Sequence, residues 1–211
     1  MNALDKAAWR SRLRAQRREL QSAADGGGLA SVALDWLETL GPDDAGLAGS
    51  GPSAGGSVCA YMSIGGEPPT GPLLAALASA GYAVFVPVCE PGFQMTWARW
   101  TPGAQMQRSS LAPVMEVVGR RLPFDRLESV RAILLPALAV DGSGVRLGQG
   151  GGYYDRFLAG LSNDGGATSV PLAAVVHENE YFPAGSLPHD SLDAPVAYAL
   201  TPAGHHAVGL T

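Results

Sequence analysis

The chain has 211 residues, of which 46% are hydrophobic and 16% are charged. This length suits one α/β domain with a full core, and the composition is that of a soluble globular protein. The net charge of −5 argues against bulk attraction to nucleic acid or to acidic membranes, so an anionic partner must be met locally. We therefore expect residues 1–211 to form a single domain, and we expect a monomer.

The cysteine content and the apolar segments favour a cytoplasmic protein. Cys59 and Cys89 have no close metal-ligand spacing and are too few for a disulfide framework, so we expect two buried thiols in a reducing compartment. No apolar run approaches the roughly 20 residues that a membrane-spanning helix needs. No apolar run has the features of a signal peptide.

The first part of the chain predicts two helices and a loop. Residues Leu4 to Leu20 contain neither Gly nor Pro, and Ala30 to Leu40 continue a helical pattern after a glycine-rich break. Residues Gly41 to Ser57 are rich in Gly, Ser and Pro and have no periodicity, which predicts a mobile surface loop.

The remainder of the chain alternates apolar runs with helical segments. The runs SVCAYMSI and YAVFVPVC flank the helical GPLLAALASAGY, which predicts a strand–helix–strand unit. MTWARW, VRAILLPALAV, PLAAVVHE and PVAYALT predict further strands, with a helix at YYDRFLAGL. Strands that are apolar throughout predict a largely parallel sheet with helices on both faces, a three-layer α/β fold of Rossmann-like type.

A glycine-rich segment, LGQGGGYYDRF, lies between the strand predicted to end near Ala139 and the helix predicted to begin near Tyr153. Ligands of α/β proteins bind at such junctions, and the N–H groups and dipole of a helix N-terminus favour phosphate. The spacing fits neither the Walker loop nor the dinucleotide fingerprint. Glycine alone therefore leaves a tight turn open as the alternative.

The charged residues beside this segment suit a Mg²⁺-nucleotide. Arg146 offers a donor for phosphate oxygens, and Asp155 offers an oxygen ligand for a hard cation. The alternative is that Asp155 complements the helix dipole with Arg156 as its solvated partner.

Two other regions carry candidate binding residues. Lys6 and Arg10 are four residues apart, hence on one helical face, in a stretch that holds six of the 14 basic residues. Glu67 follows the first predicted strand in a Gly-Gly-Glu-Pro-Pro turn, and Met62 lies on that strand. The alternatives are a solvated basic helix for Lys6 and Arg10, a plain turn residue for Glu67 and a core methionine for Met62.

The stretch ALAVDGSGVRLGQGGGYYDRFL, Ala137 to Leu158, closely resembles the signature of the 5-formyltetrahydrofolate cyclo-ligases, also called methenyltetrahydrofolate synthetases. KAAWR, AYMSIGGEPPT and LPHDSLDAPVAYALTP resemble further segments in the order of that family, so the resemblance covers almost the whole chain. The segments Gln107 to Arg121 and VVHENEYF match less well.

The resemblance implies that Mg²⁺-ATP and 5-formyltetrahydrofolate react to give 5,10-methenyltetrahydrofolate, ADP and phosphate. It implies catalytic roles for Arg146 and Asp155, and metal binding by Asp155 and Asp190. The residues implied for ATP are Lys6, Arg10, Arg146, Gly148, Gln149, Gly150, Gly151, Gly152, Tyr153 and Tyr154. The residues implied for the folate are Met62, Glu67, Gly150, Gly152 and Tyr153.

Other basic residues and histidines are expected to be structural or solvated. We expect Arg12, Arg14, Arg17 and Arg18 to be solvated, His177 and His189 to be hydrogen-bonded structural residues, and His205 and His206 to form a tail. Two other function classes stay open because fold alone does not separate them. They are a sugar-phosphate isomerase or CoA-transferase-like enzyme on a similar scaffold, and a nucleotide-binding module without turnover.

Overall fold

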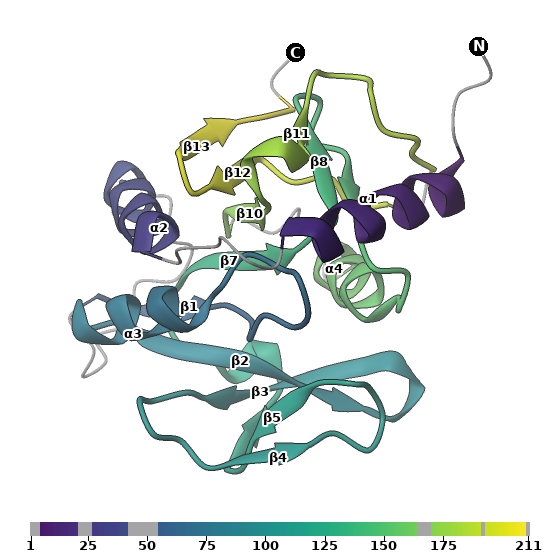
Figure 1. Cartoon of the computed structure of the whole chain (residues 1–211). Helices are drawn as coiled ribbons and strands as arrows, with labels where there is room; N and C mark the ends of the chain where they lie inside the picture. Colours follow the sequence, from purple (N-terminus) through teal and green to yellow (C-terminus); the bar gives the residue numbers. More distant parts are fainter. Residues whose placement is uncertain (1–4, 21–26, 42–54, 164–169, 191–192, 210–211) are drawn as a thin grey trace.

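The computed structural model describes residues 5–20, 27–41, 55–163, 170–190 and 193–209 (Figure 1). The loop predicted at 41–57 lies largely outside these residues, and its last residue, Ser57, begins a strand. Two helices form near the N-terminus as predicted, α1 (Lys6–Leu20) and α2 (Gly27–Thr39). The others are α3 (Gly71–Ser79) and α4 (Tyr153–Asn163).

An eight-stranded sheet runs through the protein in the order β13-β12-β10-β7-β1-β2-β3-β6. Its five central strands are mutually parallel: β12 (Tyr198–Thr201), β10 (Leu172–Val175), β7 (Val130–Pro136), β1 (Ser57–Cys59) and β2 (Ala83–Glu90). The edge strands β13 (Gly204–Ala207), β3 (Gln94–Arg99) and β6 (Arg121–Leu122) pair antiparallel. The predicted α/β class with a largely parallel sheet is confirmed.

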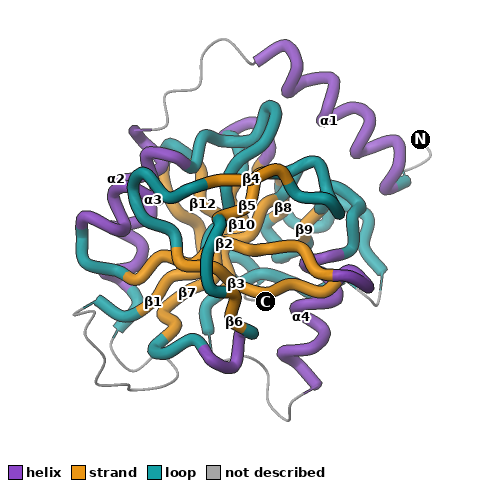
Figure 2. The backbone as a smooth tube through the Cα atoms, turned by 90° about the horizontal axis from the view of Figure 1, so that it is seen from below, coloured by secondary structure: helices purple, strands orange, loops and turns teal. Residues whose placement is uncertain are grey.

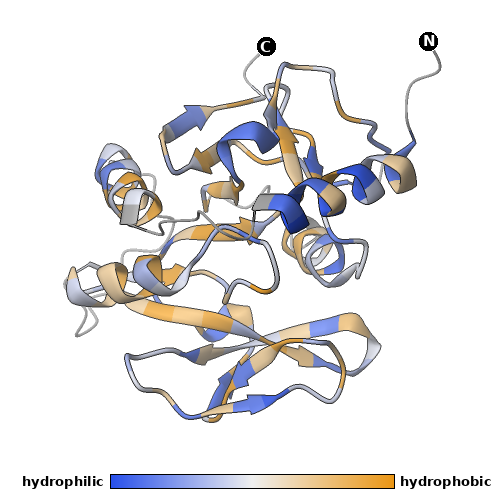
Figure 3. Cartoon of the chain, in the orientation of Figure 1, coloured by the Kyte–Doolittle hydropathy of each residue, from blue (hydrophilic) through white to orange (hydrophobic). Residues whose placement is uncertain are grey.

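Alternate residues of the central strands enter two separate cores, because successive side chains of a strand point to opposite faces. On β7, Ala132 and Leu134 pack into the core beneath α2 and α3, whereas Ile133 and Leu135 pack into the core beneath α4. Figure 3 shows these strands as hydrophobic along their length. Helices therefore cover both faces of the sheet, with α4 on the opposite side from α2 and α3 (Figure 1).

The predicted strand at 130–140 is in fact two strands. Strand β7 ends at Pro136, whose nitrogen has no hydrogen to donate to a further ladder bond. The chain then forms β8 (Ala139–Asp141), which pairs antiparallel with β9 (Arg146–Leu147) and parallel with β11 (Tyr181–Phe182). The glycine-rich segment thus follows a hairpin.

Several short elements were not predicted from the sequence. Strands β4 (Met106–Arg108) and β5 (Met115–Val117) form a separate hairpin, and η2 (Pro91–Phe93), η3 (Phe124–Arg126) and η4 (Glu178–Glu180) are single 3-10 turns. The predicted histidine tail was wrong. His205 and His206 lie on β13, and the ring of His206 stacks on Tyr181 with 4.5 Å between centroids.

Helix α1 packs outside the main sheet. Its buried Leu13 joins a small core with Leu138 and Leu147, and the Trp9 ring meets Phe182 edge-on at 5.2 Å. Figure 2 shows α1 set apart from α2 and α3. This position brings the basic N-terminal residues next to the glycine-rich segment. None of the described helices combines the length and the apolar character that crossing a bilayer requires.

Candidate active site

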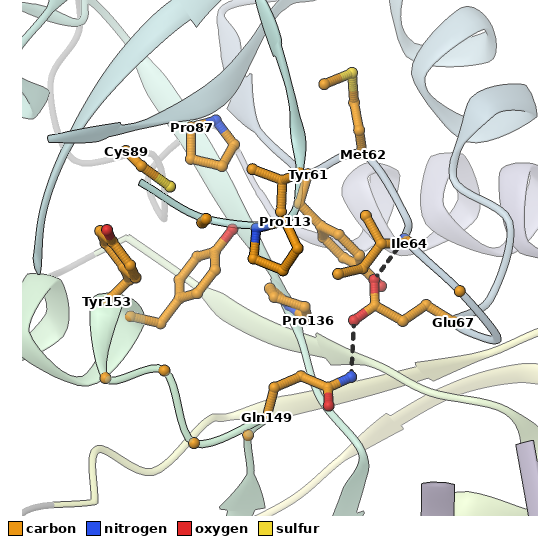
Figure 4. A pocket seen from close by; sticks show the side chains of 18 of the residues that line it. Tyr61, Met62, Ile64, Glu67, Pro87, Cys89, Pro113, Pro136, Gln149 and Tyr153 are labelled. Atoms are coloured by element: carbon orange, nitrogen blue, oxygen red, sulfur yellow. Dashed lines mark hydrogen bonds between the residues drawn. The ribbon is translucent and has the colours of Figure 1, made fainter. Parts of the chain in front are cut away.

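A cavity of about 720 Å³ lies where the central strands β1, β2 and β7 end. Its size falls within the range of roughly 300–1,000 Å³ for small-molecule sites, and its position is where open α/β sheets bind ligands. Residues 61–67, which follow β1, form one wall, and the glycine loop, residues 148–152, forms another (Figure 4). The arginines of α1 that line the cavity are Arg14, Arg17 and Arg18.

An apolar wall completes the cavity. Phe93, Leu111 and Met115 line it, and they are among the most exposed large hydrophobic residues in the described part of the chain. Exposed apolar side chains that gather at a groove mark a ligand surface. Phe93 has a φ of +60°, rare for a residue other than glycine, and its ring packs on Tyr153 at 5.4 Å. No pattern in the sequence identified these residues, because they come from short elements and a loop that the sequence did not predict.

Glu67 is a buried carboxylate on the cavity wall, with 7% of its surface exposed. Its Oε2 accepts a hydrogen bond from the Ile64 amide at 3.0 Å, and its Oε1 accepts one from Gln149 Nε2 at 3.2 Å (Figure 4). Burial raises the pKa of Glu67, and these hydrogen bonds and the charge of Arg17 offset that effect only in part. Met62 lines the same cavity, close in sequence to Glu67.

Two tyrosines with buried hydroxyl groups line this cavity. Tyr61 is 4% exposed, and the hydroxyls of Tyr61 and Tyr154 are buried without a hydrogen-bond partner among the described residues. Burial raises the pKa of both phenols, so they stay protonated near neutral pH. Both residues line the cavity, while their hydroxyl oxygens are buried behind its surface.

The glycine loop leads into the N-terminus of α4, and its shape depends on glycine. Gly150 and Gly152 have φ values of +91° and +76°, a region that side chains disfavour. A Cβ on Gly152 would lie 2.6 Å from Arg156 Nη1. The bare backbone of the loop therefore faces the cavity, and Tyr153 and Tyr154 follow it on the same lining.

Helix α1 is fastened to this loop by two arginines. Arg10 Nε donates to the Gly148 carbonyl at 3.0 Å, and Arg14 Nη2 donates to the Gln149 carbonyl at 2.6 Å. Lys6, one turn before Arg10, forms ion pairs with Asp190 at 2.6 Å and Asp193 at 2.5 Å. Burial lowers the pKa of Lys6, but the two carboxylates outweigh it, and the pKa is raised.

Arg146 and Asp155 meet beneath the loop, although they lie on β9 and α4. Arg146 Nη2 donates to Asp155 Oδ1 at 2.5 Å, and Arg146 Nη1 donates to the Pro136 carbonyl at 3.2 Å. The Arg146 side chain is 3% exposed, whereas the Asp155 side chain is 42% exposed and lines the cavity. The pair thus offers a buried cation and an accessible carboxylate at one point.

The expectation that Arg17 is solvated was wrong. Arg17 is 4% exposed, because its guanidinium bonds to both carboxylate oxygens of Glu180 and to the Ala137 carbonyl. Arg14 is exposed, but its guanidinium also donates to the Gln149 carbonyl of the glycine loop. His177, expected to be structural, is hydrogen-bonded to the Gly66 carbonyl at 2.9 Å. The pattern of basic residues on α1 could not distinguish these roles.

Residues 52–202 match the sequence model of the 5-formyltetrahydrofolate cyclo-ligase family. The chain belongs to the 5-formyltetrahydrofolate cyclo-ligase family. It is 32% identical over 154 residues to the 5-formyltetrahydrofolate cyclo-ligase of Mycolicibacterium smegmatis, covering 71% of this chain and 75% of that protein. It is 34% identical over 107 residues to the Escherichia coli 5-formyltetrahydrofolate cyclo-ligase, covering 48% and 57%.

Solved structures share the fold of this cyclo-ligase family member. The NMR structure of Aquifex aeolicus 5,10-methenyltetrahydrofolate synthetase superposes with a TM-score of 0.68 at 22% identity, covering 98% of this chain and 94% of the other. The Mycoplasma pneumoniae 5,10-methenyltetrahydrofolate synthetase superposes with a TM-score of 0.60 at 15% identity, covering 93% and 98%. At these identities the likeness concerns the fold.

The family match and the cavity overlap for most of the expected site residues. Met62, Glu67, Arg146, Asp155 and the glycine loop fall within residues 52–202 and line the cavity. Asp190 falls within the match, and Lys6 and Arg10 precede it, but none of these three is a cavity-lining residue. Arg10 instead reaches the site through Gly148.

The acidic residues are compatible with a metal ion that is held jointly by the protein and by oxygen atoms of a bound substrate. Within the described residues, no three His, Cys, Asp or Glu side chains gather as a metal site. Mg²⁺ commonly binds through one or two carboxylates together with substrate phosphates, and the half-exposed carboxylate of Asp155 on the cavity lining fits that role. Asp190 is ion-paired with Lys6, so it would have to exchange this partner to bind a metal.

Cys59 and Cys89 have different surroundings. Cys59 is buried in the core as expected, whereas Cys89 is only half-buried and lines the cavity. Burial raises the pKa of both thiols, so neither is a ready nucleophile near neutral pH.

Proposed function

We propose that this protein converts 5-formyltetrahydrofolate to 5,10-methenyltetrahydrofolate with ATP and Mg²⁺, releasing ADP and phosphate. The observation that carries this proposal is one cavity that joins a buried carboxylate, Glu67, to a glycine loop at a helix N-terminus. The first group suits the N–H groups of a pterin ring, and the second suits the phosphates of a nucleotide.

The chemistry explains why both sites must share a cavity. An N-formyl group is a poor electrophile, because the nitrogen lone pair delocalises onto it and its oxygen is a poor leaving group. Transfer of the γ-phosphoryl group to the formyl oxygen releases ADP and corrects both defects. The second folate nitrogen then attacks the formyl carbon and loses its proton, and the carbon–oxygen bond breaks to release phosphate. The formyl oxygen must therefore reach the γ-phosphorus.

The nucleotide side of the site consists of the loop, α4 and basic residues. The glycine loop backbone and the N-terminus of α4, with Tyr153 and Tyr154, are proposed to hold the phosphates. Arg146 is proposed to stabilise charge on the transferred group, since its guanidinium is buried beneath the loop. Lys6 and Arg10, on α1, are proposed to neutralise the remaining negative charge of the ATP phosphates.

The folate side of the site consists of Glu67 and the apolar wall. Glu67 is proposed to accept hydrogen bonds from the pterin, and Tyr61 lines the same cavity. Met62 and the wall of Phe93, Leu111 and Met115 are proposed to cover the apolar parts of the folate. Gly150, Gly152 and Tyr153 lie between the two sides and are proposed to contact both substrates.

We propose Asp155 as the carboxylate that holds Mg²⁺ together with ATP phosphate oxygens. When bound, the ion would neutralise charge on the β- and γ-phosphates. Asp155 would then contact both the ion and Arg146. The Arg146 guanidinium and the Asp155 carboxylate would therefore keep their relative positions. Asp190 remains a proposed second ligand that would act from beside Lys6.

Membership of the cyclo-ligase family argues against the sugar-phosphate isomerase, the CoA-transferase-like enzyme and the module without turnover. A cytoplasmic, monomeric protein without nucleic-acid or membrane partners remains part of the proposal. The two free thiols support the reducing compartment, and the net charge of −5 supports the absence of nucleic-acid and acidic-membrane partners.

A single assay tests the proposal. The purified protein with 5-formyltetrahydrofolate, ATP and Mg²⁺ should produce the near-ultraviolet absorbance of the methenyl product and one phosphate for each product molecule. Omission of any one component should abolish both signals. Accumulation of a phosphorylated folate, or the absence of a methenyl product from folded protein that binds ATP, would contradict the proposal.

A further inference from the structure

Three side chains from distant parts of the chain form a continuous series of hydrogen bonds across the cavity. Arg14 on α1 donates from Nε to Gln149 Oε1 at 3.3 Å and from Nη2 to the Gln149 carbonyl at 2.6 Å. Gln149 Nε2 in turn donates to Glu67 Oε1 at 3.2 Å. All three residues line the cavity, so the series joins the loop proposed for the nucleotide to the carboxylate proposed for the folate.

The orientation of the Gln149 amide is determined by its two partners. An arginine only donates and a carboxylate only accepts, so the amide oxygen must face Arg14 and the amide nitrogen must face Glu67. Figure 4 shows the Gln149 side chain reaching from the glycine loop toward Glu67. Both ends of the amide are therefore occupied within the protein, and its side chain is not directed at a phosphate.

Glu67 depends on this contact. The carboxylate is buried, and its two oxygens receive one donor each, the Ile64 amide and the Gln149 side chain. A buried carboxylate that loses a donor changes its position or its protonation, because an unpaired buried charge is costly. A movement of the glycine loop therefore reaches Glu67 directly through Gln149.

We propose that Gln149 is a positioning residue that couples the two substrate sites, so that ATP and the reduced folate bind with positive cooperativity. This inference rests on the proposed function. A ligand that orders either end of the Arg14–Gln149–Glu67 series removes part of the ordering cost for the ligand at the other end. Thermodynamic reciprocity requires each ligand to improve the binding of the other by the same factor.

Calorimetry on the wild-type protein and on Gln149→Leu tests the proposal. The ligands are 5-formyltetrahydrofolate and an ATP analogue with a non-transferable γ-phosphoryl group plus Mg²⁺, each titrated alone and in the presence of saturating amounts of the other. We expect the wild type to bind either ligand about fivefold or more tightly when the other is present. Gln149→Leu keeps the approximate size and removes both polar groups, so the factor should fall to about one.

Two further variants separate coupling from damage to the fold. Arg14→Leu breaks the other end of the series, so its coupling factor should also fall. Arg12 is on the same helix, and its guanidinium lies 5.5 Å from the Trp9 ring centroid. Arg12→Leu should therefore keep the wild-type coupling factor. Thermal unfolding checks that the variants are folded, and a purely structural defect would weaken both ligands without changing the factor.

The possible outcomes distinguish the inference from the function on which it rests. If the wild type binds both ligands with a factor of about one, or if Gln149→Leu keeps the wild-type factor, the coupling role is wrong and the proposed function stands. If the wild type binds neither ligand, the proposed function fails and the coupling role fails with it.

Discussion

Arg17 and Glu180 lie 163 positions apart in the chain, yet their side chains form an ion pair with 2.6 Å between Nε and Oε1. Both residues are buried, and Glu180 Oε2 also accepts a hydrogen bond from the His177 amide at 2.9 Å. A Cβ on Gly66, next to Glu67, would lie 2.9 Å from the Arg17 Cβ. The pair thus ties α1, the turn that carries Glu67 and the η4 segment together beside the cavity.

Replacement of Arg17 by methionine should lower the free energy of unfolding by about 3–5 kcal/mol, because it leaves the buried Glu180 carboxylate without its charged partner. Arg18→Met, one position along and exposed, is the matched control and should change stability by about 0.5 kcal/mol or less. Chemical denaturation measures both values. Equal effects of the two substitutions would show that the pair contributes little.

Lys6→Ala and Arg10→Ala should each raise the KM for ATP by about tenfold or more and leave the KM for the folate nearly unchanged. Each change removes a charged donor that is proposed to contact the nucleotide phosphates, and such a hydrogen bond contributes about 1.5–3 kcal/mol. Steady-state kinetics with one substrate varied at a time measures the two KM values. Similar increases for both substrates would place these residues away from the nucleotide.

Asp155→Asn should reduce turnover by about 100-fold or more while the protein remains folded. The change removes the carboxylate charge proposed to hold Mg²⁺ and leaves Arg146 buried without its charged partner. The assay should be repeated over a range of Mg²⁺ concentrations, with a thermal melt as the check on folding. Near-wild-type turnover with an unchanged Mg²⁺ requirement would reject the assignment.

Glu67→Gln should weaken folate binding by roughly tenfold or more without weakening ATP-analogue binding by itself, since a charged acceptor contributes about 1.5–3 kcal/mol per hydrogen bond. The glutamine keeps the shape and loses the charge. Calorimetry with each ligand alone measures both affinities. Unchanged folate affinity would make Glu67 a turn residue.

The pH dependence of folate binding should report the protonation of Glu67. The pKa of Glu67 is raised by burial, so on acidification the carboxylate is lost at a higher pH than for an ordinary glutamate, and folate affinity should fall with it. Tyr61 and Tyr154 do not titrate in this range, because burial raises their pKa values, and Arg17 stays charged. Glu67→Gln should remove this pH dependence.

Protonation of Glu67 should stabilise the folded protein, whereas it should weaken folate binding. A carboxyl group whose pKa is raised in the folded state binds its proton more tightly there than in the unfolded chain. Glu67 therefore contributes stability that increases as the pH falls through its folded pKa. Unfolding experiments on the wild type and on Glu67→Gln measure this contribution, and the wild type alone should gain the acid stabilisation.

The order of the helices and central strands and the place of the glycine loop could be predicted because they depend on local properties. The apolar runs of the central strands, the absence of Gly and Pro in α1 and the start of α4 at Tyr153 are written in short stretches of sequence. The resemblance of residues 137–158 to the cyclo-ligase signature identified the family for the same reason. The break of the strand at Pro136 was missed, although proline carries the signal for it.

The partners of the charged residues could be decided only by the tertiary structure. Six basic residues between Lys6 and Arg18 look alike in the sequence, yet Arg17 is buried against Glu180, Arg14 holds Gln149, and Lys6 meets Asp190. The physical reason is that burial and ion pairing depend on which distant segment packs against each face of α1, and no short window of sequence contains both partners. The apolar wall of Phe93, Leu111 and Met115 arises in the same way, from separate short segments that only the folded chain brings to one cavity.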